Sequence, residues 1–312
     1  MGNISDSAMN DAQVKLNNIL NVLNSVVVGK EKQIQWAVSC LLSGGHLLVE
    51  GLPGEGKTTL VQSLAAVLGL SYRRVQFTND LLPSDILGVS MYSRETESFT
   101  FHAGPIFTQF LMADEINRAS PKTQSALLEA MAERQVTIEG ETRLLPVPFC
   151  VVATQNPIDQ VGAHALPESQ LDRFLICIRL GYMDRKSECS VLMGEDRQEL
   201  IKDISQVIIT EEFIQLQNIV KQQHCSQAVY DYILDIAEFS RKSKYFSHGL
   251  SSRSLVGLLS IAKAYALFHK RSYVLPEDIQ ELLPSVIDHR LTLNVPEDVL
   301  PSEIVLSHVA VS

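Results

Sequence analysis

Apolar residues recur along the chain with two different spacings, and these spacings predict both helices and strands. Residues 11–24 and 31–43 repeat apolar side chains every three to four positions, which is typical of helices that bury one face. A further helix is expected from about Lys57 to Leu68. Five short apolar runs have the length of buried strands, at residues 46–50, 72–77, 110–114, 149–154 and 174–180. Buried strands that alternate with helices predict an α/β fold, with a mainly parallel sheet covered on both faces.

Two segments interrupt this alternation. Residues 85–103 alternate polar and apolar side chains around the sequence S-R-E-T-E-S, and they predict an inserted β-hairpin. Residues 135–146 predict a second hairpin, because β-prone residues flank the turn at Glu139-Gly140-Glu141. The α/β core is therefore expected to carry two small antiparallel additions.

After about residue 184 the strand pattern ends. A polar, helix-like stretch follows, and then four helical patterns at residues 211–224, 226–243, 252–270 and 276–290. Pro276 suits the first turn of the last of these helices, and the acids after it favour that end of a helix. We therefore expect an α/β core at 1–184, a linker at 185–210 and a small all-α domain at 211–312.

Charge and cysteine content narrow the classes of function. The 36 acidic and 26 basic residues give a net charge of −10, which argues against a broad nucleic-acid or anionic-lipid surface. No apolar run is long enough to span a membrane, and the first residues lack the pattern of a signal peptide. The five cysteines form no C-x-x-C motif, and four lie in or beside apolar runs. These features favour a reducing, cytoplasmic location.

The clearest chemical motif follows the first predicted strand. Gly51-Leu52-Pro53-Gly54-Glu55-Gly56-Lys57-Thr58 fits the phosphate-binding pattern G-x-x-x-x-G-K-[ST] at every position, and it opens a predicted helix. The glycines let backbone N–H groups curl around phosphates, and the helix N-terminus adds partial positive charge. Lys57 would reach the β- and γ-phosphates, and Thr58 would offer its hydroxyl to Mg²⁺. The alternative is a glycine-rich turn with a solvated lysine.

Two adjacent acids end the third predicted strand. Asp114 and Glu115 follow an apolar run, so they are expected to leave the core at the carboxyl edge of the sheet, where ligands bind in such folds. There Asp114 would hold Mg²⁺, and Glu115 would orient and deprotonate the attacking water. The alternative is a pair of helix-capping acids before Ile116.

The fourth predicted strand also ends in polar residues. The amide of Asn156 is expected to lie between the two acids and the γ-phosphate and to hold the water. The alternative is turn formation, because Asn before Pro commonly starts a turn.

Two arginines complete the set of candidate residues. Arg173 stands just before the fifth strand, where it would either pair with Asp172 or Glu168 or act as an arginine finger on a neighbouring subunit's γ-phosphate. Arg253 falls in the first turn of a helix that Ser251 or Ser252 would cap. A cation is unfavourable there unless an anion is near, so Arg253 would sense phosphate or form a surface salt bridge.

Together these motifs resemble the AAA+ ATPases, and specifically the MoxR family. The resemblance runs from about Val28 to Arg290 and includes G-G-H-L-L-V-E-G-L-P-G-E-G-K-T, Q-F-T-N-D-L-L-P-S-D-I-L-G, F-H-A-G-P-I-F, A-D-E-I-N-R-A-S-P-K-T-Q-S-A-L-L-E-A-M, A-T-Q-N-P, A-L-P-E-S-Q-L-D-R-F and G-L-S-S-R-S. It implies a Walker A motif at Gly51–Thr58 and a Walker B motif at Asp114 and Glu115. It also implies sensor one at Asn156.

The resemblance assigns the remaining roles as well. It implies the finger at Arg173, sensor two at Arg253 and a lid formed by the C-terminal helices. The hairpin at 85–103 would be a helix-two insert, and that at 135–146 a pre-sensor-one hairpin. The nucleotide-contacting residues it implies are Val28, Gly29, Pro53, Gly54, Glu55, Gly56, Lys57, Thr58 and Thr59, of which Val28 and Gly29 would lie beside the adenine.

Three positions need comment against the family pattern. Glu55 puts an acid where relatives often have a small or apolar residue, and Ser252 stands where a proline is usual. Arg118, just past the acids, is a further candidate for an interface between subunits. In relatives with the insert the lid can be displaced, which leaves open whether Arg253 serves its own nucleotide or a neighbour's.

The function implied is Mg²⁺-dependent ATP hydrolysis in a ring, most often a hexamer, that acts as a chaperone on partner complexes. A partner with a von Willebrand A domain is expected. Three rival functions stay open: a nucleic-acid motor, a motor like that of metal chelatases, and a nucleotide-gated scaffold with little turnover. Glu115, Asn156 and Arg173 together argue against the scaffold, because a scaffold needs none of them. A GTPase is not favoured, since no N-K-x-D motif is present.

Overall fold

A five-stranded parallel sheet forms the centre of the molecule, as predicted. The computed structural model describes residues 6–94, 97–156, 164–193, 200–201, 204–294 and 299–311. The strands are β1 (Leu47–Glu50), β2 (Tyr72–Gln76), β5 (Phe110–Asp114), β8 (Cys150–Gln155) and β9 (Ile176–Arg179). They lie in the order β2-β5-β8-β1-β9, and all neighbours pair in parallel. Their carboxyl ends therefore share one edge of the sheet.

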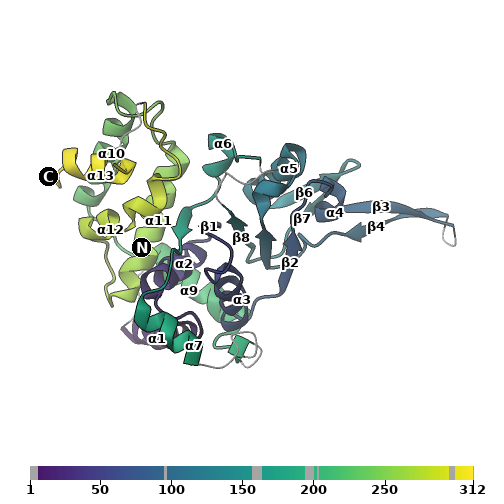
Figure 1. Ribbon diagram of the computed structural model, residues 1–312, viewed down its shortest axis with the longest axis horizontal. Helices are drawn as coiled ribbons and strands as arrows, with labels where there is room; N and C mark the ends of the chain where they lie inside the picture. The colour runs from purple at the N-terminus through teal and green to yellow at the C-terminus, as the bar shows by residue number, and fades with distance from the viewer. Residues whose placement is uncertain are drawn as a thin grey trace.

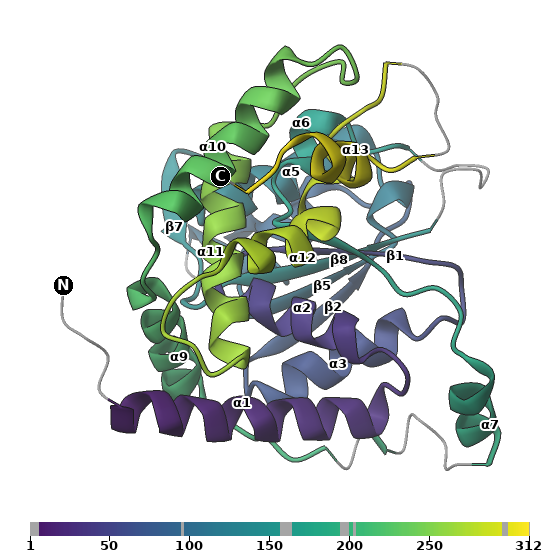
Figure 2. The same ribbon diagram turned by 90° about the vertical axis from the view of Figure 1, so that its left-hand side faces the viewer.

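Helices cover both faces of this sheet, and alternate residues of each strand face opposite cores. Leu47 and Val49 of β1 pack with α1 (Asp6–Val26), α2 (Glu31–Leu42) and α3 (Lys57–Val67). Leu48 faces the other core, which includes α5 (Pro121–Glu133). Figure 2 shows α1, α2 and α3 on one side of the strands and α5 on the other. This alternation has the period of two that pleated strands impose.

Both predicted hairpins are present. After the short helix α4 (Pro83–Leu87), strands β3 (Gly88–Ser93) and β4 (Ser98–Ala103) form an arm that projects far from the sheet (Figure 1). Strands β6 (Gln135–Ile138) and β7 (Glu141–Leu144) form the second hairpin. The guanidinium of Arg143 lies 4.0 Å from the ring centre of Phe101, so side chains of the two hairpins are in contact.

The C-terminal part of the chain is helical. The four predicted helices are α9 (Thr210–Gln222), α10 (Gln227–Lys242), α11 (Ser252–Phe268) and α12 (Pro276–Ile287). The polar stretch before them contains α7 (Arg185–Met193), and its residues 194–199 lie outside the described part of the chain. The short elements η1 (Ile116–Arg118), α6 (Glu168–Leu171) and α13 (Pro301–His308) were not predicted, and neither were helices α4 and α5. None of the described helices is long and apolar enough to cross a membrane.

The C-terminal helices share a hydrophobic core with the helices on one face of the sheet. The predicted domain boundaries at residues 184 and 210 stay predictions. Helix α9 packs against α2, and the amide of Gln217 donates to the carbonyl of Leu41 at 2.9 Å. Buried residues of α9, α11 and α12 belong to the same core as α1 and α2. Among the cysteines, Cys40, Cys150 and Cys177 are buried in the core, Cys225 is half-buried and Cys189 is exposed.

One carboxylate joins the helical part to the core. Asp172, between α6 and β9, accepts hydrogen bonds from Ser251 (3.0 Å) and Ser254 (2.7 Å) at the start of α11. It also pairs with Arg290, whose Nε lies 3.0 Å away. The buried guanidinium of Arg290 donates further to backbone carbonyls just before β9. Asp172 thereby attaches the start of α11 to the segment between α6 and β9. Arg173 is the next residue in that segment.

Candidate functional site

The phosphate-loop motif forms a turn between the end of β1 and the start of α3. Gly54 and Gly56 have φ values of +89° and +87°, in the left-handed region that favours glycine. Gly56 is the N-cap of α3, and no side chain caps this helix. A Cβ atom on either glycine would meet nothing within 4 Å, so the left-handed backbone, and not crowding, is what favours glycine at both positions. The free N–H groups of the first helical turn, at Lys57, Thr58 and Thr59, provide donors for an anion.

Lys57 points back into this turn. Its side chain is buried, and Nζ donates to the carbonyls of Gly51 and Leu52 (3.3 Å) and to Oδ1 of Asn156 (2.6 Å). Burial lowers the pKa of Lys57, while the nearby carboxylates of Glu55, Asp114 and Glu115 act in the opposite direction. The ammonium is therefore held at the mouth of the loop by oxygen acceptors.

Asp114 ends β5 and is held on both carboxylate oxygens. Its Oδ1 accepts from the hydroxyl of Thr154 at 2.5 Å, and its Oδ2 accepts from Nη2 and Nε of Arg74 at 2.6 and 3.1 Å. Asp114 is almost fully buried, whereas Arg74 is partly exposed on the edge strand β2. The pairing fixes the carboxylate at the carboxyl edge of the sheet.

Glu115 follows in an uncommon backbone conformation. Its φ of +55° is left-handed, and its N–H donates to the hydroxyl of Thr154 at 2.9 Å. The carboxylate accepts from Gln76 (2.8 Å) and Asn156 (2.9 Å) and pairs with Arg118 (3.0 Å). A left-handed residue outside glycine is costly, and such residues gather at functional sites.

Asn156 connects the lysine to the glutamate. Its Oδ1 accepts from Lys57 and its Nδ2 donates to Glu115, so one amide spans the two charged groups. Its backbone carbonyl accepts from the amide of Asn117 at 3.1 Å. Nearly all of its surface is buried. The side chain of Asn156 thus joins the lysine of the phosphate loop directly to Glu115.

A small cavity adjoins the other side of the loop. Val28 lines it with Gly54, Glu55, Gly56 and Thr59, and the other lining residues are Val26, Val27, Lys30 and Met183. This apolar wall suits a flat ring.

Gly29, the other residue predicted to lie beside the adenine, packs closely against Ser187 next to this cavity. Gly29 has a φ of +71°, and a Cβ there would lie 2.5 Å from the hydroxyl oxygen of Ser187. Next to it, the buried ammonium of Lys30 donates to three consecutive carbonyls, those of Leu180, Gly181 and Tyr182. The segment after β9 is thereby fixed beside the cavity.

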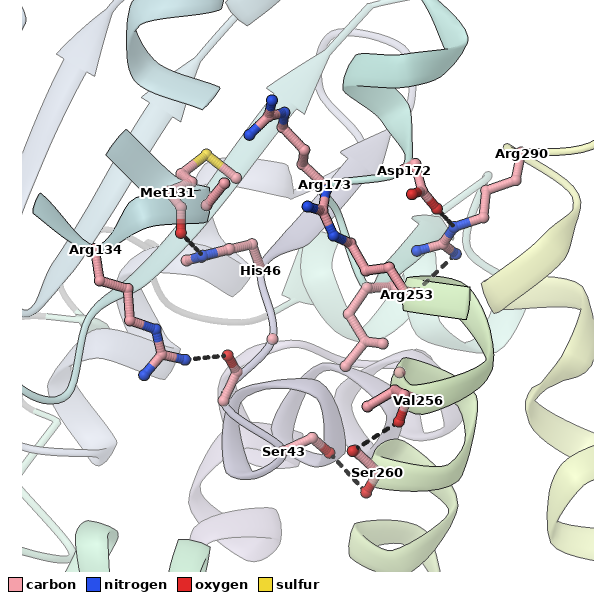
Figure 3. A pocket seen from close by; sticks show the side chains of 15 residues that line it. Ser43, His46, Met131, Arg134, Asp172, Arg173, Arg253, Val256, Ser260 and Arg290 are labelled. Atoms are coloured by element: carbon pink, nitrogen blue, oxygen red, sulfur yellow. Dashed lines mark hydrogen bonds and ion pairs between the residues drawn. The ribbon is translucent and has the colours of Figure 1, made fainter. Parts of the chain in front are cut away.

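The two candidate arginines lie elsewhere, in a second and larger pocket (Figure 3). Arg173 donates from Nη1 to the carbonyl of Leu128 at 3.0 Å, and Arg253 lies on the first turn of α11, which Ser251 caps. Arg134 and Arg290 line the same pocket. Within the described residues, no carboxylate lies within ion-pair distance of Arg173, so neither Asp172 nor Glu168 is its partner. We call this pocket, lined by Arg134, Arg173, Arg253 and Arg290, the cationic pocket.

The structure therefore divides the predicted residues into two groups. The phosphate loop, Asp114, Glu115 and Asn156 meet at one edge of the sheet, whereas Arg173 and Arg253 meet in the cationic pocket. Glu55 folds into the loop, and its Oε2 is buried without a hydrogen-bond partner.

Five residues that contact or line these two sites were not selected as candidates from the sequence. Gln76 and Thr154 stand at or next to the ends of strands, so the rule that selected Asp114 applies to them too. Arg74 lies two residues before a strand end, and its role depends on the pairing of β2 with β5. Lys30 and Arg134 had no sequence signal beyond their charge.

Comparisons with known proteins agree on the class. Residues 46–176 match the family described as "ATPase family associated with various cellular activities (AAA)", and residues 238–306 match the family described as "AAA lid domain". The second match runs from the end of α10 into α13 and lies within the region 211–312 that was predicted to be helical.

Whole-chain relatives are similar over most of their length. The chain is 45% identical over 272 residues to the uncharacterized protein YeaC of Bacillus subtilis, covering 87% of this chain and 85% of that protein. It is 39% identical to the chaperone MoxR1 of Mycobacterium tuberculosis, covering 91% and 78%. A crystal structure of a Cytophaga hutchinsonii protein assigned as an ATPase superposes with a TM-score of 0.88 at 35% identity, covering 98% of both chains.

Proposed function

The chain belongs to the MoxR family of AAA+ ATPases, and from that premise we propose that it uses ATP hydrolysis to remodel or activate partner protein complexes. We propose further that the subunits assemble into a ring before turnover, and that each active site is completed between two neighbouring subunits. The observation that carries this proposal is the separation of Arg173 and Arg253 from the phosphate loop.

The proposed assembly is a hexameric ring in which turnover requires contact between neighbouring subunits.

The residues of the phosphate loop fit a nucleoside triphosphate with Mg²⁺. The loop offers backbone N–H groups, a buried ammonium at Lys57 and a hydroxyl at Thr58. Thr58 and Asp114 would hold Mg²⁺, which offsets phosphate charge when it is bound. Among the described residues no cluster of three or more His, Cys, Asp or Glu side chains could hold a metal by itself. This agrees with a Mg²⁺ site that relies on few protein ligands and on the phosphates.

The side chains at the sheet edge are arranged for hydrolysis of the terminal phosphate. Glu115 is the proposed base that accepts a proton from the attacking water, and Asn156, already bonded to it, orients that water. Lys57 places its positive charge at the phosphates. The small cavity lined by Val28 and Thr59 is the proposed adenine site.

The cationic pocket supplies the remaining charge to a neighbour. Among the described residues its one lining carboxylate, Asp172, is already paired with Arg290. Arg173 and Arg253 therefore need an anion from outside their own chain, and a neighbour's γ-phosphate is that anion in this proposal. Arg253 accordingly serves the neighbour's nucleotide and not its own.

The proposed output is a conformational change. Hydrolysis would alter the contact between subunits and so move the lid and the two hairpins that project from the core. The proposed partner carries a von Willebrand A domain, in keeping with the family resemblance. Recovery of such a protein in pull-downs with the Glu115→Gln variant, and not with Lys57→Ala, would test the partner separately.

The test of the proposed function is Mg²⁺-dependent ATP hydrolysis measured over a range of protein concentrations. We expect specific activity to rise with concentration, a loss of about 100-fold or more in Glu115→Gln, and a loss of about 1,000-fold in Arg173→Ala. Arg185→Ala, which removes an exposed arginine at the start of α7, is the matched control and should retain activity. Activity that is independent of concentration and unchanged in Arg173→Ala would refute the shared site.

A further inference from the structure

The cationic pocket contains a third arginine to which neither the motifs nor the comparisons give a role. Arg134 is the C-cap of α5 and stands directly before β6, the first strand of the second hairpin. In Figure 3, Arg134 comes from the side of α5 and Arg253 from the side of α11. Three different parts of the fold thus bring guanidinium groups to one cavity, because Arg173 precedes β9.

The charges of this pocket are not balanced within the described residues. Asp172 is the one carboxylate that lines it, and Arg290 and two serine hydroxyls at the start of α11 already occupy its oxygens. Arg134 donates from Nη2 to a neutral carbonyl, that of Gly44, at 3.3 Å. Arg134, Arg173 and Arg253 therefore face one cavity without a carboxylate partner. Like charges held together in this way favour the binding of an anion.

A buried histidine also lines this pocket. His46 lines the pocket, and burial lowers its pKa to about 4, with the charge of Arg134 acting in the same direction. His46 is therefore neutral near pH 7 and adds no further positive charge to the cavity.

The backbone holds Arg134 firmly in place. Its φ of +54° is left-handed, a conformation in which glycine or asparagine is the usual C-cap. Its N–H donates to the carbonyl of Ala130 at 2.9 Å, and its carbonyl accepts from Leu145 at 3.0 Å, just after β7. The residue therefore closes both the end of α5 and the base of the hairpin. An arginine at a strained position next to an anion-favouring cavity suggests that the side chain is needed there.

We propose that Arg134 is a third residue that contacts the terminal phosphates of the neighbouring subunit's nucleotide, together with Arg173 and Arg253. This inference rests on the proposed function, since it needs the shared site. It adds a connection that the two other arginines do not give. Arg134 also closes the base of the β6–β7 hairpin through its backbone. Gain or loss of a contact with the γ-phosphate would therefore change the position of that hairpin directly.

A mixing experiment tests whether Arg134 acts across the interface. Lys57→Ala lacks the phosphate-binding lysine but keeps its arginines, and Arg134→Ala keeps its phosphate loop. Each variant alone should lose at least tenfold in kcat. Mixed in equal amounts, they should recover roughly a quarter of the parent activity, because random ring assembly places an intact loop against an intact arginine at about one interface in four. A mixture that is no more active than the average of its components overturns the proposal.

Matched variants separate a structural role from a phosphate contact. Arg134→Gly relieves the backbone strain, so it should unfold at a higher urea concentration than Arg134→Ala and yet be equally inactive. Arg134→Lys should recover part of kcat because it retains the charge. Arg143→Ala, which removes the other arginine of the same hairpin outside the pocket, should keep kcat within about twofold of the parent. An active Arg134→Gly protein would overturn the proposal even if Arg134→Ala failed to fold.

A second mixing experiment distinguishes failure of this inference from failure of the proposed function. Arg173→Ala mixed with Lys57→Ala should also recover activity. Recovery in that mixture without recovery in the Arg134→Ala mixture removes Arg134 and leaves the shared site standing. No recovery in either mixture removes the shared site, and with it the role of Arg134.

Discussion

At the scale of single residues, the candidate site is ordered by short polar contacts that hold charged groups close together. Asn156 is bonded to Lys57 and to Glu115, and Thr154 is bonded to Asp114 and to the N–H of Glu115. Each uncharged side chain thus fixes two groups of the proposed hydrolysis machinery relative to each other. Such preorganisation removes part of the cost of arranging charged groups during the reaction.

Burial of one histidine predicts how stability depends on pH. His46 has a folded-state pKa of about 4, below its ordinary value of 6.5, because burial disfavours the charged ring. Between these values the unfolded chain binds a proton that the folded chain does not, so stability falls as the pH is lowered. From pH 7 to pH 5 the expected loss from His46 is about 2 kcal/mol. The measurement is urea unfolding at both pH values.

The matched variant for this prediction is His46→Gln, which cannot titrate but can still bond the backbone groups that His46 contacts, the N–H of Val151 and the carbonyl of Met131. It should lose less stability on acidification than the parent. His289, whose pKa is also lowered well below 6.5 by burial, keeps a slope of the same sign in both proteins. Equal losses in the two proteins would contradict the assignment to His46.

The site residues that could be predicted from the sequence are those at or just after the ends of strands. The apolar runs that end in Asp114, Glu115 and Asn156 locate these side chains at one edge of a parallel sheet. Arg74 and Arg134 were not predictable in this way. The role of Arg74 requires the register of β2 with β5, and that of Arg134 requires α5 and α11 to meet around one cavity. Both are tertiary facts that no local pattern records.

At the scale of elements, the attachment of the C-terminal helices depends on Asp172. It accepts from two serines at the start of α11 and pairs with Arg290, which is buried. Burial lowers the pKa of Arg290, and Asp172 acts against that effect by stabilising the charged form. A buried cation depends strongly on such a partner.

Removal of this partner should therefore loosen the helices from the core. Asp172→Ala leaves the guanidinium of Arg290 without its carboxylate, and breaking a buried pair costs about 3–5 kcal/mol. We expect a lower midpoint of urea unfolding and reduced hydrolysis, because Arg173 and Arg253 flank the lost contact. Asp235→Ala, which removes an exposed acid of α10, serves as the control. If both variants unfold at the same urea concentration, Asp172 does not hold the helices in place.

Most elements with long, regular patterns were predicted, whereas α5, of 13 residues, and the short helices α4, α6 and α13 were not. The five strands, both hairpins and helices α9 to α12 all occur where the period of their apolar residues indicates. The short helices α6 and α13, of four and eight residues, contain too few turns for a period to be read. The packing of α9 against α2 was also unforeseen, because a sequence pattern shows that a face is buried but not what buries it.

At the scale of the whole molecule, the nucleotide itself is expected to promote assembly. One surface carries the phosphate loop with Asp114 and Glu115, and another carries the cationic pocket. A triphosphate bound to the loop adds the negative charge that Arg173 and Arg253 need, so it should draw neighbouring subunits together against the repulsion of a chain with net charge −10.

The last prediction follows from this role of the nucleotide. Glu115→Gln, which should bind ATP without hydrolysing it, is expected to assemble at protein concentrations at least about tenfold lower with Mg²⁺-ATP than with Mg²⁺-ADP, which corresponds to about 1.4 kcal/mol. Sedimentation velocity measures this directly. Since the contacts are ionic and partly exposed, raising the salt from about 0.1 to 0.5 M should narrow the difference. Adding Arg173→Ala to the same variant should narrow it as well, because one of the groups that reads the γ-phosphate is gone. Equal assembly with both nucleotides would mean that the γ-phosphate is not part of the interface, and the cationic pocket would then require another anion.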